Sequence, residues 1–191
     1  ASAVRQEVLK GSTVQAALAA APPLMEEVMR REASAYGMAS IERMRDDIRA
    51  RLPVMSHLQA EQGARACNEL AVNGVPALRR MLGEGFYKDK QLAGMADGLE
   101  ASFVRTAAEG RRLRVDHKPL DQADWQAIAR YLISKGMAEK DFSVFADPAK
   151  SVEDPKTCGI FMRFMDLVTA PGNDAATRII PFVATAATAG E

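Results

Sequence analysis

Apolar residues recur three or four positions apart through every long segment of this chain. That spacing places them on one face of an α-helix, so the pattern predicts helices along the whole sequence. No segment alternates apolar and polar residues for long enough to predict a strand, and no internal repeat is present. We therefore expect an all-α fold, a single domain over residues 1–191 built as an irregular bundle of about seven or eight helices.

One segment, residues 154–170, has the most apolar helical pattern. Apolar side chains cover most of its circumference, which is typical of a helix with neighbours on several sides. We expect this helix, begun by Asp154 and Pro155, to be buried at the centre of the bundle. Its small and polar positions fall on one narrow stripe, formed by Gly159, Arg163, Asp166 and Ala170. The segments expected to pack around it are 54–72, 88–113 and 121–135.

Prolines predict two breaks in the first half of the chain, because proline removes a backbone donor and clashes with the preceding helical turn. Pro22–Pro23 separates a peripheral N-terminal helix within residues 1–20 from the helix that follows. Pro53 separates a helix over 41–52 from a helix over 54–72.

Short connections and glycines predict how some helices pair. Segments 24–36 and 41–52 are joined by four residues and are expected to form an αα-hairpin. Gly94 and Gly98 stand four positions apart in segment 88–113, so we expect another helix to approach closely there.

Three further patterns set helix ends. Asn73–Gly74 predicts a helix end, since glycine readily adopts a left-handed backbone. Asp121 and Asp124 predict a capping box before a helix whose inner face includes Trp125. Residues 184–191 have little apolar surface to bury, and we expect them to fray.

Composition excludes some classes of protein. Lys and Arg number 25, and Asp and Glu number 25, so the formal net charge is zero. A nucleic-acid-binding protein normally carries an excess of basic residues to neutralise phosphates, so we expect no nucleic-acid partner. No apolar run approaches the ~20 residues that a membrane-spanning helix needs.

The two cysteines, Cys67 and Cys158, both fall on apolar helix faces. They are either joined in a disulfide or buried separately as small apolar side chains, and an even count in an oxidising compartment favours the disulfide. The sequence begins without Met, as after removal of a signal peptide or in a piece of a longer protein. We expect a periplasmic or secreted protein, with a cytoplasmic protein as the alternative.

Catalytic motifs are absent from the sequence, which contains no GxSxG, no phosphate-binding GxxxxGK[ST] and no GxGxxG. Too few cysteines and histidines are suitably spaced for a zinc site, so we expect no metal and no cofactor. An enzyme would need residues dispersed over several helices, and the first candidates are His57, Glu61, Arg163 and Asp166. We also expect Arg163 and Asp166 to form an ion pair on the helix surface.

Two groups of residues are candidate binding sites. The central helix carries methionines beside phenylalanines, which predicts either a filled core or an apolar cleft that adapts to its ligand. The cleft residues are Phe161, Met162, Phe164 and Met165. A basic cluster either binds an anion or is a solvated loop near acidic residues. It consists of Arg111, Arg112, Arg114, His117 and Lys118.

These patterns favour a non-catalytic, exported helical module that binds a protein partner or an apolar ligand. The alternatives are an enzyme with a dispersed active site and a cytosolic adaptor with two free thiols.

Overall fold

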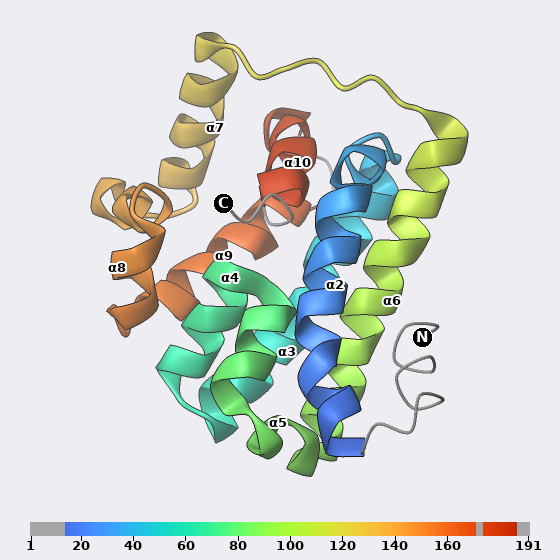
Figure 1. Ribbon diagram of the computed structural model, residues 1–191. Coiled ribbons are helices and arrows are strands. Elements are labelled where there is room, and N and C mark those ends of the chain that lie inside the picture. The colour runs from blue at the N-terminus through green and yellow to red at the C-terminus, as the bar shows by residue number, and fades with distance from the viewer. Residues whose placement is uncertain (1–13, 171–173, 187–191) are drawn as a thin grey trace.

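The computed structural model describes residues 14–170 and 174–186, and within these ranges the chain forms helices and no strand (Figure 1). The predicted all-α bundle is therefore confirmed. In chain order the elements are α2 Val14–Tyr36, α3 Ile41–Glu61, α4 Ala64–Leu82, α5 Glu84–Lys88, α6 Lys90–Leu113, α7 Gln122–Ser134, the 3-10 helix η1 Glu139–Phe145, α8 Pro148–Glu153, α9 Thr157–Thr169 and α10 Asp174–Ala186. Most of the predicted N-terminal helix and frayed tail, residues 1–13 and 187–191, lie outside the described residues.

The predicted breaks at the prolines are wrong. Helix α2 continues through Pro22–Pro23, and α3 continues through Pro53. Packing of the flanking turns compensates for the hydrogen bond that a proline removes, and Val54 and Met55 next to Pro53 are fully buried.

The break lies instead at Gly63, so the predicted helix 54–72 is divided between α3 and α4. Gly63 has a φ of 86°, a left-handed backbone that glycine adopts without a steric penalty. Gly74, with a φ of 77°, interrupts the helical backbone inside α4, where Asn73–Gly74 predicted an end.

Helix α9 is buried much as its pattern predicted. Its stripe is turned to solvent, with Gly159, Arg163 and Asp166 exposed, while Met165 and Val168 are 3% and 0% exposed. Its predicted beginning is wrong, because the helix starts at Thr157. The Asp154 carboxylate accepts a hydrogen bond from the Lys156 amide at 2.9 Å, within the turn before the helix.

The neighbours of α9 are α3, α10, α4 and η1. The prediction that segment 88–113 packs against it is wrong, because α2 and α3 cover the apolar face of α6. Helix α7 packs mainly against α10 and reaches α9 through Tyr131, whose hydroxyl donates to Leu167 O at 3.4 Å.

Helix α2 lies along α6 rather than along α3, so the predicted αα-hairpin is wrong (Figure 1). Gly110 brings α2 and α6 together, because a Cβ atom at this position would stand 1.7 Å from Ala35 O. Gly94 and Gly98 are exposed with open space around them, so the close contact predicted there is also wrong.

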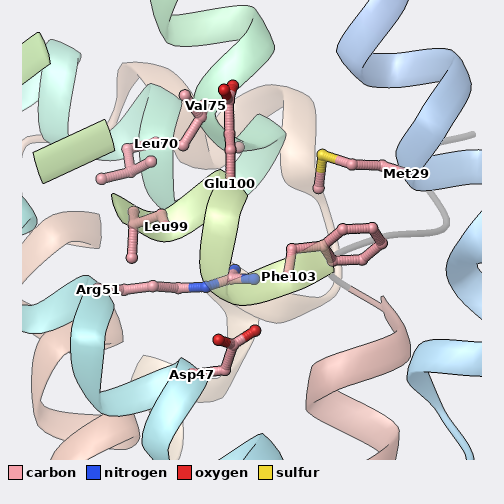
Figure 2. A pocket seen from close by; sticks show the side chains of 9 residues that line it. Met29, Asp47, Arg51, Leu70, Val75, Leu99, Glu100 and Phe103 are labelled. Carbon is pink, nitrogen blue, oxygen red and sulfur yellow. The ribbon is translucent and has the colours of Figure 1, made fainter. Parts of the chain in front are cut away.

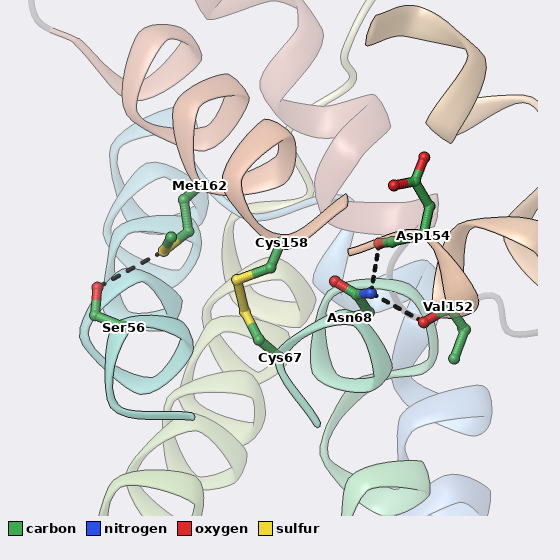
Figure 3. The surroundings of a disulfide bond; sticks show 7 residues. All are labelled: Ser56, Cys67, Asn68, Val152, Asp154, Cys158 and Met162. Atoms are coloured by element: carbon green, nitrogen blue, oxygen red, sulfur yellow. Dashed lines mark hydrogen bonds between the residues drawn. A yellow bond between two sulfur atoms is a disulfide. The ribbon is translucent and has the colours of Figure 1, made fainter. Parts of the chain in front are cut away.

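The disulfide between Cys67 and Cys158 joins α4 to α9, and it confirms the interpretation that the sequence favoured (Figure 3). The two Cα atoms are 5.6 Å apart, and both residues are fully buried. Beside the disulfide, the Asn68 amide donates to Val152 O at 2.9 Å and to Asp154 O at 2.8 Å.

Residues 114–121 form an extended connection between α6 and α7, which we call the strap (Figure 1). Backbone and side-chain hydrogen bonds fasten it to the α2–α3 loop. The Val115 amide donates to Met38 O at 2.9 Å, and His117 Nε2 lies 2.8 Å from Ala39 O. The strap ends at the predicted capping box of Asp121 and Asp124, which is present.

Candidate functional site

A cavity of about 620 Å³ lies among α7, η1, α9 and α10 and is closed behind by α3 and α4. We call it the apolar cavity. Arg51 is the one ionisable side chain among the described residues that line it. Its apolar walls include Ile128, Leu132, Val144, Phe145, Phe164 and Met165.

The structure places three of the four predicted cleft residues in this cavity. Phe161, Phe164 and Met165 line it, because they share one side of α9. Met162 does not, since its side chain is directed to α3, where Sδ is 3.7 Å from the hydroxyl of Ser56 (Figure 3). Phe145 from η1 completes the aromatic wall, with its ring centroid 4.9 Å from that of Phe161.

A second cavity of about 440 Å³ lies between the strap, the end of α2 and α10. We call it the strap cavity. It is more polar than the first, because the ionisable residues Asp116, His117, Lys118 and Arg178 are among those that line it.

The two cavities share one aromatic pair in their linings. Trp125 of α7 and Phe182 of α10 line both cavities, and their rings contact edge to face with centroids 4.9 Å apart. The prediction that Trp125 faces inward is wrong, since it is 39% exposed and Phe182 is 50% exposed.

The residues of the predicted basic cluster do not all line one cavity. Only His117 and Lys118 line the strap cavity, while Arg111 forms an ion pair with Glu32 of α2. Arg112 and Arg114 are exposed at and just beyond the end of α6 and do not line that cavity.

A third, much smaller cavity of about 30 Å³ is lined by Asp47, Arg51 and Glu100 (Figure 2). The Tyr36 hydroxyl donates to Asp47 at 2.7 Å, and burial raises the pKa of Tyr36. Burial also raises the pKa of Glu100, although the Arg79 guanidinium 3.2 Å away opposes this shift. A cavity of this volume holds about one water molecule, so it offers no room for a substrate.

The four residues first considered for catalysis are not brought together. His57 is paired with Asp89 at 2.8 Å, and Glu61 is exposed at the end of α3. Arg163 donates to Lys135 O at 2.7 Å rather than to Asp166, so the ion pair predicted between Arg163 and Asp166 is wrong.

No protein-family model matches this chain, and comparisons with curated proteins and with solved structures give no significant match. Among the described residues there is no group of three or more His, Cys, Asp or Glu side chains placed to hold a metal ion. Within the same ranges, no helix has both the length and the apolar character needed to span a membrane.

Sequence reasoning found the α9 wall of the apolar cavity but missed the α7, η1 and α10 walls. These walls come from segments that are separate in the chain, and no local pattern shows that they face one another. One signal was available in the sequence, since Phe182 follows Pro181 in a strongly apolar stretch over residues 179–184.

Proposed function

We propose that this protein is a binding protein that takes an apolar ligand into the apolar cavity. The observation that supports this most directly is the cavity's volume of about 620 Å³ together with its apolar lining. Small-molecule sites typically enclose ~300–1,000 Å³ and are lined mainly by hydrophobic and aromatic side chains. With Arg51 as the one ionisable lining residue of the described chain, the cavity has no acid–base pair for catalysis.

A protein partner is the second candidate. Large apolar side chains at the rim of the cavity are partly exposed, among them Phe145 at 36% and Phe182 at 50%. An apolar segment of a partner would cover such side chains. The concave shape of the cavity favours a small ligand over a flat protein surface.

The disulfide supports a location outside the cytoplasm. Disulfides persist in oxidising compartments, and cytosolic thiols are normally kept reduced. Because Cys67 and Cys158 are fully buried, their bond has a structural role and is not placed for exchange with solvent thiols. We propose that the protein works in the periplasm or is secreted.

Binding of the neutral fluorescent probe N-phenyl-1-naphthylamine tests the proposal. Trp125 is the single tryptophan of the chain and lines the cavity, so energy transfer from it reports a bound probe. We expect saturable binding by the wild type and at least a tenfold loss in Ala129→Phe, which fills the cavity from α7. Ala123→Phe makes the same change at an exposed position of α7 outside the cavity and is the matched control.

Two results would count against the proposal. One is the absence of saturable probe binding by the folded wild type. The other is equal binding by Ala129→Phe and Ala123→Phe, which would place the probe elsewhere on the protein.

A further inference from the structure

We infer that the ligand is a single-chain amphiphile with an anionic head, its apolar chain in the apolar cavity and its carboxylate or phosphate in the strap cavity. This inference rests on the proposed function and specifies the chemistry of the ligand.

The first support is the position of the two cavities. The Trp125–Phe182 ring pair lines both of them. A ligand passing these rings has its apolar chain on the side of α9 and its other end beneath the strap. Aromatic residues suit such a boundary, because they have an apolar body and tolerate partial exposure.

The second support is the set of groups beneath the strap. Lys118 and Arg178 supply positively charged donors, which bind carboxylate and phosphate oxygens. His117 directs Nε2 at the Ala39 carbonyl 2.8 Å away, so this nitrogen carries a hydrogen and the ring is fixed in the wall. Asp116 is the one carboxylate among the described lining residues.

Carboxylates next to this cavity are already engaged by helix α7. Asp121 accepts from the Asp124 amide at 2.9 Å, and Asp124 accepts from the Asp121 amide at 3.3 Å. Their charges also face the partial positive charge of the helix N-terminus. Lys118, 3.2 Å from Asp121, and Arg178, beside Asp124, each have one carboxylate partner, and a ligand oxygen would share these donors with it.

The exposure of the Lys118 and Arg178 side chains determines how much the anionic head of the ligand contributes to the binding affinity. The side chains of Lys118 and Arg178 are 75% and 62% exposed, so an ion pair with the ligand is weakened by solvent. The apolar chain then supplies most of the affinity, and the head supplies selectivity. Each added methylene raises affinity about fourfold until the apolar cavity is filled.

Displacement of N-phenyl-1-naphthylamine by three ligands with the same alkyl chain tests this inference. Dodecanoate, dodecyl phosphate and 1-dodecanol are compared below the concentrations at which they form micelles. We expect both anions to displace the probe at several-fold lower concentration than the alcohol, and to lose part of this preference in high salt. Whichever anion displaces the probe more tightly identifies the head as carboxylate or phosphate.

Variants locate the head. Lys118→Gln is expected to lower the preference for the anions about threefold without changing the affinity for the alcohol. Asp116→Asn is expected to raise the preference for the anions. Arg130→Gln removes an exposed charge of α7 that lines neither cavity, and is the control. Lys118 is used in preference to Arg178, because Arg178 is the ion-pair partner of the buried Asp124.

Some outcomes overturn the inference while leaving the proposed function intact. These are equal displacement by the alcohol and the anions, an unchanged anion preference in Lys118→Gln, or displacement of the probe by inorganic phosphate alone. Absence of probe binding by the wild type contradicts the proposed function itself, so the two failures are distinguishable.

Discussion

Gly110 shows how one residue fixes the distance between two helices. Its missing side chain lets α6 approach the backbone of α2, where Ala35 O occupies the space that a Cβ atom would need. Gly98, which also lies on α6, makes no such close contact, since it is exposed with open space around it.

Replacing Gly110 by alanine is therefore expected to be strongly destabilising. The new methyl group would lie 1.7 Å from Ala35 O, and backbone atoms must shift to accept it. We expect the free energy of unfolding to fall by an amount near the upper end of the ~0.5–3 kcal/mol range of single substitutions, measured by chemical denaturation. Gly98→Ala is the matched control and should stabilise α6 by up to ~1 kcal/mol, because alanine favours a helix. Equal effects of the two changes would contradict the close contact.

Glu100 shows how burial acts on one charge. It is 9% exposed, and among the described atoms its Oε1 has no hydrogen-bond partner. Burial raises the pKa of this carboxyl above its ordinary value of 4.5, so the folded protein binds a proton at Glu100 more tightly than the unfolded chain does. Its contribution to stability is full below pH 4.5 and is lost as the pH rises through the raised pKa.

Glu100→Gln should remove this pH dependence, because the amide is neutral throughout. The difference in free energy of unfolding, variant minus wild type, is expected to increase as the pH rises from about 4 to about 7. Arg79 keeps its ion pair with Asp97 at 2.6 Å in the variant. Urea denaturation across this range measures the difference, and a constant difference would contradict the raised pKa.

At the scale of elements, α4 is joined to α9 by the disulfide and to the end of α8 by Asn68. The disulfide joins Cys67 to Cys158, and Asn68 next to it binds the carbonyls of Val152 and Asp154 before α9 begins. The disulfide holds α9, which forms one wall of the apolar cavity. The Asn68 amide supplies both hydrogen bonds, so aspartate, which has no donor at this position, cannot replace it.

Removing the disulfide should cost a large share of the stability. It closes a loop with a sequence separation of 91 residues, which corresponds to about 4–5 kcal/mol in the chain-entropy model. We expect the double variant Cys67→Ala, Cys158→Ala to lose this amount in urea denaturation. A reducing agent, which reaches the buried bond when urea unfolds the chain, should lower the stability of the wild type similarly and leave the variant unchanged. A loss below ~1 kcal/mol would show that the contacts of Asn68 and the core suffice.

At the scale of the whole molecule, the apolar cavity leaves part of the helical core unfilled. A ligand that fills it binds the folded state and not the unfolded chain, so it must raise the free energy of unfolding. At a free concentration of ~100 Kd, N-phenyl-1-naphthylamine should add about 2.7 kcal/mol. Thermal denaturation checks this, with Ala129→Phe expected to show little ligand effect and Ala123→Phe the full effect.

The helical class, the burial of α9 and the cysteine pairing could be predicted from the sequence, because each depends on a local pattern or on two residues. Pro53 and Gly63 show where this reasoning failed. Tertiary packing kept the proline inside α3, while a glycine without an obvious turn sequence ended the helix. The cavities could not be predicted, because Trp125 and Phe182 meet only when α7 folds back over α10.

The strap lies inside the loop closed by the disulfide, since residues 114–121 fall between Cys67 and Cys158. It is extended and partly exposed, the kind of segment that proteases cut most readily. A single cut there would yield two fragments that stay covalently attached. Such nicked protein should migrate as two bands on a reducing gel and as one band on a non-reducing gel. The cut would free the end of the strap that leads into α7 without releasing either half of the chain.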